Sequence, residues 1–320
     1  MKTTVIIPNY NGMQFLEACL SSLREQKYDF ETILVDNASG DDSLLYVREN
    51  FPEVQVIAAD KNEGFSAAVN RGIKAATTPY VLLLNNDTRV EKDFVKNLET
   101  ALDKKTDYFG IQAKMCMMSE PDRMDDAGDL YCALGWAFAI GKGKPQKNYN
   151  RFYPVFAPCA GAAIYRKEVM GEIGFFDEAH FAYLEDIDIA YRAKIAGYKN
   201  GFCPDAVVLH VGSGSSGSRY NAFKVRLAAR NSVYLIYKNM PFLQVLINLP
   251  FLVFGFLVKT AFFVKKGFGK EYVKALLEGF SMMKKADIRS NKVKFKWKNL
   301  GNYVKIQLEL WIGVVRRITG

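Results

Sequence analysis

Short apolar runs alternate with stretches of helical periodicity through the first third of this 320-residue chain. Residues 4–7 form a β-branched run, and the apolar residues that follow, Phe15, Leu16, Cys19, Leu20 and Leu23, recur at helical spacing. The same alternation predicts strands at residues 32–35, 54–58, 80–84 and 108–113, and helices from Ser43, across 62–76 and across 91–102. This spacing predicts an α/β fold with a doubly wound, mostly parallel, Rossmann-like sheet covered by helices.

Polar residues follow four of the predicted strands. They are Pro8-Asn9-Tyr10-Asn11, Asp36-Asn37, Asn62-Glu63-Gly64 and Asn85-Asn86-Asp87. Turns and helix caps use the same residue types, so a turn explains any one of these clusters. Because ligands bind outside the carboxyl ends of the strands in such sheets, four clusters along one edge favour a binding site.

The first turn excludes two common ways of binding phosphate. Residues 8–13 read PNYNGM and do not supply the GxGxxG of a dinucleotide site, and the chain has no GxxxxGK[ST] Walker loop. The remaining strategy is a divalent cation held by a carboxylate at a strand end, and Asp87 is the candidate.

Composition and charge narrow the class of protein. A hydrophobic content of 49% argues against disorder, and 43 basic against 34 acidic residues give a net charge of +9. Beyond residue 258 only four acidic residues remain among many lysines, so the positive charge belongs to the tail. The five cysteines include no CxxC pair, which predicts reduced, mostly buried thiols in a cytosolic setting, and the first apolar run is too short for a signal peptide.

Five segments together resemble a known family. PNYNG, VDNAS, NEGFSAAVN, LLLNND and FFDEAHFAYLEDIDIAYR look like the successive motifs of family-two glycosyltransferases with a GT-A fold, particularly the rhamnosyltransferase-like branch of bacterial polysaccharide assembly. The resemblance covers roughly residues 3 to 240. It implies that residues 85–87 stand where the family keeps its metal-binding DxD, and that Asp87 holds Mg²⁺ or Mn²⁺ on the donor diphosphate. Two of these three positions are amides, which are weaker ligands for a hard cation.

The resemblance also implies a donor pocket. Its lining would be Pro8, Tyr10, Asp36, Asn62 and Gly64, with Asn86 facing the donor ribose or sugar. An aspartate can accept the imide N–H of uracil or thymine, and an aromatic residue offers a stacking face. The segments at residues 125–128 and 159–162 resemble those that surround the sugar and the acceptor, although Asp-Ala-Gly is also an ordinary turn.

A second acidic cluster lies in LEDIDIAYR. Glu185 and Asp186 stand at a predicted helix start, where the helix dipole by itself favours carboxylates. The family places its catalytic base in this pair, usually at the second position, so the resemblance implies Asp186 as base and Glu185 as support. We interpret Asp188 and Arg192, four residues apart, as a pair that supports the helix.

The two histidines receive different interpretations. A lone histidine is more often structural than a ligand, but the family can use a histidine after the acidic pair, which makes His210 a candidate ligand of the metal or the diphosphate. The glycine- and serine-rich residues 212–217 would form a mobile loop over the donor. His180 is interpreted as a packing residue or part of the acceptor edge.

The last 80 residues predict a membrane-associating region. Residues 242–264 are long enough to cross a bilayer but include Asn248, Pro250 and Lys259. Amphipathic helices that lie on an anionic membrane, flanked by lysines, account for both the apolar content and the charge, whereas a buried hairpin of a soluble protein is the alternative. We therefore expect a catalytic domain at 1–240, a helical membrane-associating region at 241–320, and a cytoplasmic location, peripheral on the inner face of the plasma membrane.

Two hypotheses of function remain. The first is an inverting, metal-dependent enzyme that transfers a sugar from a dTDP- or UDP-sugar to a lipid-linked or polysaccharide acceptor in cell-surface glycan assembly, and the resemblance suggests rhamnose as that sugar. The second is a non-catalytic scaffold that binds nucleotide sugar or glycan. The presence of Asp36, Asp87 and Asp186 favours the first, and neither hypothesis includes a nucleic-acid partner. The chain lacks the QxxRW motif of processive synthases.

Overall fold

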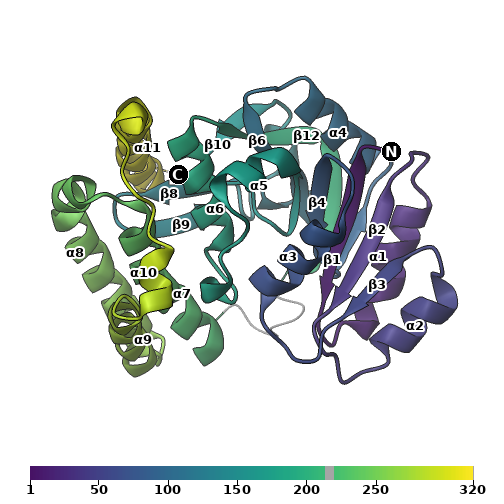
Figure 1. Cartoon of the computed structure of the whole chain (residues 1–320), viewed down its shortest axis with the longest axis horizontal. Helices are drawn as coiled ribbons and strands as arrows, with labels where there is room; N and C mark the ends of the chain where they lie inside the picture. The colour runs from purple at the N-terminus through teal and green to yellow at the C-terminus, as the bar shows by residue number, and fades with distance from the viewer. Residues whose placement is uncertain (213–219, 320) are drawn as a thin grey trace.

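A mixed sheet with helices on both faces forms the centre of the protein (Figure 1). The computed structural model describes residues 1–212 and 220–319. The ten strands of the sheet are β1 (Thr3–Asn9), β2 (Glu31–Asp36), β3 (Gln55–Ala58), β4 (Tyr80–Leu84), β5 (Thr88–Val90), β6 (Tyr108–Met117), β7 (Met124–Asp126), β10 (Tyr153–Val155), β11 (Ala162–Arg166) and β12 (Lys199–His210).

The strand order is β10-β12-β6-β11-β4-β1-β2-β3, with β5 beside β12 and β7 beside β6. Strands β1 to β4, β6 and β12 run in one direction, whereas β5, β7, β10 and β11 run in the other. The predicted class, a mostly parallel α/β sheet, is confirmed. The antiparallel β11 lies between β4 and β6 and links the two parallel parts.

Alternate residues of the strands enter two separate cores. Val5 and Ile7 of β1 pack in the core on one face, which includes residues of α1 (Met13–Arg24) and α4 (Phe94–Asp103). Ile6 points to the other face, where it packs with α3 (Phe65–Ala75). This two-sided burial explains why the strands read as continuous apolar runs rather than as an alternating pattern. The helices α2 (Ser43–Asn50), α5 (Lys167–Ile173) and α6 (Glu185–Ala196) complete the layers.

The predicted elements of the first third are confirmed, although the helix predicted at 62–76 spans Phe65–Ala75 and two further boundaries change. The helix predicted across 91–102 begins at Phe94, because residues 88–90 form β5 and pair with β12, where Val90 lies opposite Val208. Strand β6 continues to Met117, since its last residues also pair with β12. Both changes depend on a partner about a hundred residues away, which local periodicity does not reveal.

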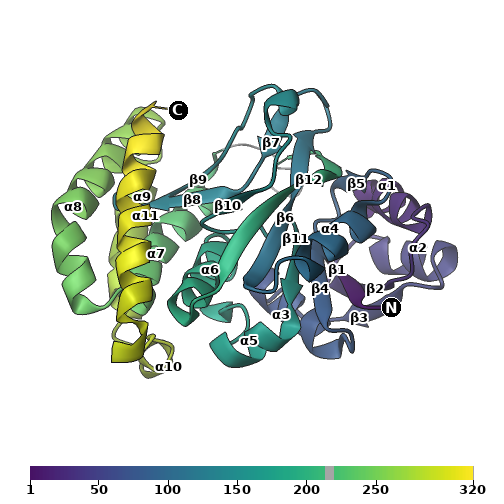
Figure 2. The same ribbon diagram turned by 90° about the horizontal axis from the view of Figure 1, so that it is seen from above.

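The C-terminal helices stack against one end of the sheet (Figures 1 and 2). They are α7 (Ala222–Asn239), α8 (Phe242–Lys265), α9 (Gly269–Met282), α10 (Ala286–Ser290) and α11 (Leu300–Thr319). Short elements complete the chain: the hairpin of β8 (Asp129–Cys132) and β9 (Trp136–Ala139), and the 3₁₀ turns η1 (Gln146–Asn148), η2 (Glu178–His180) and η4 (Trp297–Asn299). Tyr131, Tyr191, Leu235, Leu252 and Leu310 share one buried cluster, so residues on both sides of the predicted division at 240 share a core.

Helix α8 is unbroken. Polar side chains lie on its buried face and apolar side chains on its exposed face, the reverse of the pattern in a helix of a soluble protein. Asn248 and Pro250, predicted to interrupt it, lie within the continuous helix. Its buried residues include Gln244 and Asn248, whose side chains hydrogen-bond Tyr191 and Gln307 at 2.8 Å each. Bulky apolar residues face outward instead, among them Phe254 and Leu257, which are 60% and 63% exposed.

Candidate active site

The polar residues predicted at the strand ends meet at one edge of the sheet. Asn86, just after β4, donates from Nδ2 to Oδ1 of Asn9 at 2.7 Å, and Asn9 donates from its own Nδ2 to Oδ1 of Asp36 at 2.8 Å. Ser39 donates to both oxygens of Asp36, from its Oγ at 2.5 Å and its backbone N–H at 2.9 Å. The ends of β4, β1 and β2 are therefore joined by a buried chain of hydrogen bonds.

Two residues predicted to line the donor pocket, Asp36 and Asn86, bond to other residues of the protein in this network. Asp36 is fully buried and both of its oxygens accept hydrogen bonds within the protein, while Asn86 is 4% exposed. Both side chains organise the loops at the edge of the sheet. Their predicted contacts with the donor base and sugar remain predictions.

A second network shapes the loop before α3. Asn37 donates from Nδ2 to the side chain of Asn62 at 2.9 Å and to the carbonyl of Gly64 at 3.1 Å. Gly64 has φ +89°, and a Cβ at this position would lie 2.5 Å from the carbonyl oxygen of Phe181. Only glycine fits a loop that takes this conformation and approaches another backbone so closely.

Tyr10 and Pro8 flank this region. The Tyr10 side chain is exposed at 46%, so its ring is free to meet a ligand at the edge, whereas Pro8 is half-buried at the end of β1. An exposed aromatic ring can stack on a planar base, and this role of Tyr10 stays a prediction.

The candidate metal ligands lie side by side. His210 ends β12 opposite Thr88 of β5, which places its Nε2 3.2 Å from Oδ1 of Asp87. Its Nδ1 lies 2.7 Å from Oδ2 of Asp125, and the other Asp125 oxygen accepts from Lys142 Nζ at 2.6 Å. The predicted pair of Asp87 and His210 is thus brought together, with a third residue behind the imidazole.

The carboxylates of this cluster attract positive charge and hold a proton on His210, which a metal bound to its Nε2 would displace. Burial alone would lower the pKa of His210, but hydrogen bonds to Asp125 and Asp87 raise it to about 9. Burial opposes ionisation of Asp125, yet His210 and Lys142 lower its pKa to about 2. An imidazole and a carboxylate oxygen are suitable ligands for Mn²⁺ or Mg²⁺, and a carboxylate behind Nδ1 is the arrangement that orients metal-binding histidines. The residues present therefore fit a divalent metal.

The acidic pair begins helix α6, as predicted. Glu185 and Asp186 are its first two residues, and the Asp186 carboxylate accepts the backbone N–H of Ile187 at 2.7 Å and also that of Ala160. Burial raises the pKa of Asp186 to about 6, while burial and the charge of Asp186 raise the pKa of Glu185 to about 8. The pair titrates as a unit, and burial with mutual repulsion favours one retained proton at neutral pH, with Glu185 the member whose pKa is raised further.

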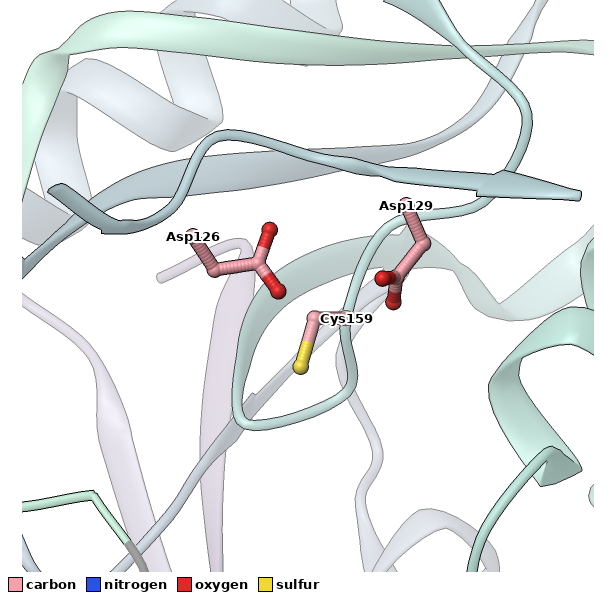
Figure 3. A group of neighbouring side chains, drawn as sticks. All are labelled: Asp126, Asp129 and Cys159. Carbon is pink, nitrogen blue, oxygen red and sulfur yellow. The ribbon is translucent and has the colours of Figure 1, made fainter. Parts of the chain in front are cut away.

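Two further carboxylates face this pair. Asp126 lies at the end of β7 and Asp129 at the start of β8. A carboxylate oxygen of each and the Sγ atom of Cys159 lie within 4.8 Å of one another (Figure 3). Burial raises the pKa of Asp126 to about 6, although Gln112 donates to it at 2.9 Å, and the charges of Asp125 and Asp186 add to the rise. The charge of Asp186 also raises the pKa of Asp126 and of Asp129, so these carboxyls lie close enough to the candidate base to interact with it.

Adjacent residues of β7 join the two clusters. Asp125 bonds His210 in the metal pair, whereas its neighbour Asp126 is close enough to Asp186 to affect ionisation. The backbone makes a second connection, because Asn85 donates its N–H to the carbonyl of Gly161 at 2.8 Å, one residue from the Ala160 N–H that binds Asp186. The candidate cation site and the candidate base thus belong to one site.

Asp188 has a larger role than the predicted helix pair. It does accept two hydrogen bonds from Arg192, at 3.0 and 2.8 Å, but it also accepts from Lys238 Nζ and Asn239 Nδ2, both at 2.8 Å. Lys238 bonds Asp177 as well, at 2.6 Å. The network ties α6 to α7 and to the segment before α6.

His180 is a packing residue, as one of its interpretations proposed. It is fully buried, its ring lies 5.1 Å from that of Tyr234, and burial lowers its pKa to about 4. It approaches Asp177 and Asp188, but the Lys238 ammonium already bonds both of those carboxylates.

Several residues of the site escaped sequence analysis. Asp125 had been assigned only to a sugar-contacting segment, and Asp129 and Lys238 received no role. The doublet Asp125-Asp126 was the available signal, since two adjacent carboxylates on a strand direct their side chains to different partners. Residues 213–219, predicted to form a loop over the donor, lie outside the described residues.

Comparison with known proteins identifies the family. Residues 4–174, more than half of the chain, match the family model described as glycosyl transferase family 2. The chain belongs to glycosyl transferase family 2. It is a nucleotide-sugar-dependent glycosyltransferase.

Similar proteins include two sugar transferases that match most of the chain. The low-salt glycan biosynthesis hexosyltransferase Agl10 of Haloferax volcanii is 25% identical over 277 residues, 82% of this chain and 85% of that protein. The N-acetylglucosaminyl-diphospho-decaprenol L-rhamnosyltransferase of Mycobacterium tuberculosis is 25% identical over 244 residues, 67% of this chain and 77% of that protein.

Solved structures share the fold. GalNAc-T7 with UDP, GalNAc and Mn²⁺ superposes with a TM-score of 0.60 at 18% identity, over 74% of this chain and 47% of that one. The mannosyltransferase PcManGT of Pyrobaculum calidifontis, in complex with GDP-Man and Mn²⁺, superposes with a TM-score of 0.55 at 17% identity, over 99% of this chain and 87% of that one. These likenesses establish the GT-A fold.

Proposed function

We propose that the protein is an inverting, metal-dependent glycosyltransferase that moves a sugar from a dTDP- or UDP-sugar to a hydroxyl of a lipid-linked or polysaccharide acceptor in cell-surface glycan assembly. The observation that carries the proposal is the junction at Asp125 and Asp126, which connects the cation pair of Asp87 and His210 to the acidic pair that contains Asp186.

The chemistry assigns one task to each cluster. Asp87 and His210 would hold Mg²⁺ or Mn²⁺, which neutralises negative charge on the diphosphate as it leaves. Asp186 accepts the proton of the acceptor hydroxyl while that oxygen attacks the anomeric carbon. The bond from the anomeric carbon to the diphosphate oxygen breaks, the nucleoside diphosphate departs, and a single displacement inverts the anomeric configuration.

Rhamnose is the leading sugar of the proposal. Its support is the similarity to the L-rhamnosyltransferase of Mycobacterium tuberculosis, whose name also specifies a lipid-diphosphate-linked acceptor. A panel of UDP- and dTDP-sugars, each with a lipid-diphosphate-linked acceptor, tests the donor and acceptor together by mass spectrometry of the product. NMR of the new linkage tests inversion, and a product that keeps the donor's anomeric configuration would contradict the single displacement.

We further propose that the outer face of α8 docks on an anionic bilayer, at the inner surface of the plasma membrane. By length and composition α8 is long and apolar enough to cross a membrane, and little of its apolar stretch is buried in the protein. The reversed polarity of the helix supports lipid as the occupant, since Gln244 and Asn248 face inward and bond Tyr191 and Gln307 while Phe and Leu side chains face out. Exposed lysines at its end, Lys265 and Lys266, complement acidic headgroups.

Co-sedimentation with vesicles tests the docking. Leu257→Glu should reduce binding to vesicles that contain acidic phospholipid, whereas Leu45→Glu on α2, a leucine of similar exposure at 57%, should not. Equal binding by the two variants would place the contact elsewhere. A detergent-sensitive dimer without vesicle binding would show that a second copy covers the face.

A further inference from the structure

The segment that leads into the candidate base has an unusual backbone. Phe181, Tyr183 and Leu184 have φ values of 64°, 70° and 68°, although none of them is glycine. Side chains with a Cβ rarely adopt this left-handed region, and it persists only where the surroundings hold it in place. Leu184 directly precedes Glu185 and Asp186, so this backbone sets where helix α6 begins.

One buried side chain of α7 bonds to most of this segment. Asn231 is fully buried, and the carbonyl oxygens of His180, Ala182 and Tyr183 lie 2.9, 2.9 and 2.8 Å from its Nδ2, whose two hydrogens these three acceptors share. The carbonyl of His180 also accepts the backbone N–H of Ala182 at 2.8 Å, so Asn231 adds a bond from α7 to a turn that the segment already makes. An amide that bonds three such carbonyls fixes their relative orientation.

The neighbouring arginine orients that amide. Arg230 donates from Nε to Oδ1 of Asn231 at 3.0 Å, which determines which end of the amide faces the segment. Its Nη2 also donates to the carbonyls of Ala179 and His180, at 3.0 and 2.8 Å. Two consecutive residues of α7 therefore hold residues 179–183.

The far side of the same segment contacts the loop predicted to bind the donor. The carbonyl of Phe181 accepts the backbone N–H of Ser66, in the first turn of α3, at 3.2 Å. The ring of Phe181 lies against Gly64, where an added Cβ would come within 2.6 Å of it. The segment thus spans the distance from the loop at Gly64 to the start of α6.

We propose that Asn231, oriented by Arg230, is a positioning residue that holds segment 181–184 and thereby fixes Asp186 relative to the donor loop. The proposal rests on the proposed function, because it gives Asp186 the role of base. Asn231 lies behind the segment and acts through it, without touching the reacting groups.

Steady-state kinetics with the full-length chain test the effect on transfer. Asn231→Asp keeps the shape of the side chain and an acceptor for Arg230 but removes the donors to the three carbonyls. Because a displacement of about 1 Å at a reacting group can reduce the rate on the order of 100-fold, we expect kcat to fall by about that factor. The donor KM should change little, since the donor loop keeps its own network through Asn37 and Asn62.

Asn200→Ala is the matched control. Asn200 is also fully buried, and its Nδ2 donates to one backbone carbonyl, that of Phe156, at 2.8 Å. A loss that reflects general destabilisation would appear in both variants, whereas a positioning role predicts the kcat loss in Asn231→Asp alone. If Asn231→Asp does not fold, Arg230→Gln removes the orienting group from a partly exposed position and should show a smaller loss in the same direction.

Hydrogen exchange measured by mass spectrometry separates this proposal from the proposed function. Asn231→Asp should increase hydrogen exchange in residues 179–187. Asn200→Ala should leave exchange in the same residues at the wild-type level. Unchanged exchange in that segment, or wild-type kcat despite increased exchange, would overturn the proposal. If the wild-type protein transfers no sugar from any donor, the proposed function fails, and exchange alone then decides whether Asn231 holds the segment.

Discussion

Replacing Glu185 with glutamine should make the protein more stable, although the residue lies in the candidate active site. Glu185 is 7% exposed, and its Oε2 is buried without a hydrogen-bond partner. Burial and the neighbouring charge of Asp186 raise its pKa to about 8 from the ordinary value of 4.5. Glutamine has the same shape but does not ionise. Glu185→Gln therefore removes the free-energy cost of burying a carboxyl group that would be ionised in the unfolded chain.

The sign and size of the effect follow from linkage. The folded protein holds the Glu185 proton more tightly than the unfolded chain, so the unfolding free energy falls as the pH rises from 4.5 toward 8. At about 1.4 kcal/mol per pH unit, the wild-type cost is below about 1 kcal/mol at pH 5, about 3 kcal/mol at pH 7, and about 4 to 5 kcal/mol at pH 8. Glu185→Gln should gain these amounts.

Denaturant unfolding at these three pH values measures the gain directly. Glu49→Gln on the exposed face of α2 is the control, and we expect its stability to follow that of the wild type at each pH. A Glu185→Gln protein that is no more stable at pH 7, or whose gain does not grow with pH, would refute the assignment of a buried, protonated carboxyl beside the base.

Three further outcomes follow from the site. Asp186→Asn should abolish transfer and leave donor binding, measured by calorimetry, nearly intact, and equal turnover by the variant would remove the base assignment. The kcat of the wild type should rise as the pH passes through about 6, because the base then loses its proton. Asp125→Asn should weaken Mn²⁺ affinity by about 10- to 100-fold, because it leaves the proposed ligands in place but removes the carboxylate behind His210, and unchanged affinity would exclude that role. Asp188→Asn should destabilise the fold by about 3 to 5 kcal/mol in denaturant unfolding, since it leaves Lys238 and Arg192 buried near an uncharged partner; a wild-type midpoint would contradict this.

The sequence predicted the parts of the fold that depend on local pattern. The strand-helix alternation through residue 113 placed β1 to β4 and the polar loops that follow them, because both the apolar runs and the turn residues are contiguous in the chain. The pairing of β5 with β12, and with it the approach of His210 to Asp87, depends on residues about 120 positions apart. Without the family resemblance, no periodicity would have joined these two residues.

The support around the base was less predictable still. Asn231 lies in the middle of α7, where its place in the sequence resembles that of any polar helical residue. Its role becomes visible only with the left-handed backbone of residues 181–184, which no residue type there indicates, since Phe, Tyr and Leu avoid that conformation. Likewise, Asn248 interrupts an apolar stretch of the sequence, and only its bond to Gln307 shows that it faces inward, as does Gln244, which bonds Tyr191.

The central claim is a metal-dependent donor site at the edge formed by β1, β2 and β4. Calorimetric titration of the purified protein with UDP and with dTDP, each with and without Mn²⁺, tests it most directly. We expect one nucleotide to bind with Mn²⁺ and to bind much more weakly without it, and dTDP as that nucleotide would strengthen the case for rhamnose. Binding of neither nucleotide under any condition would contradict the claim and favour a scaffold that keeps the fold without its chemistry.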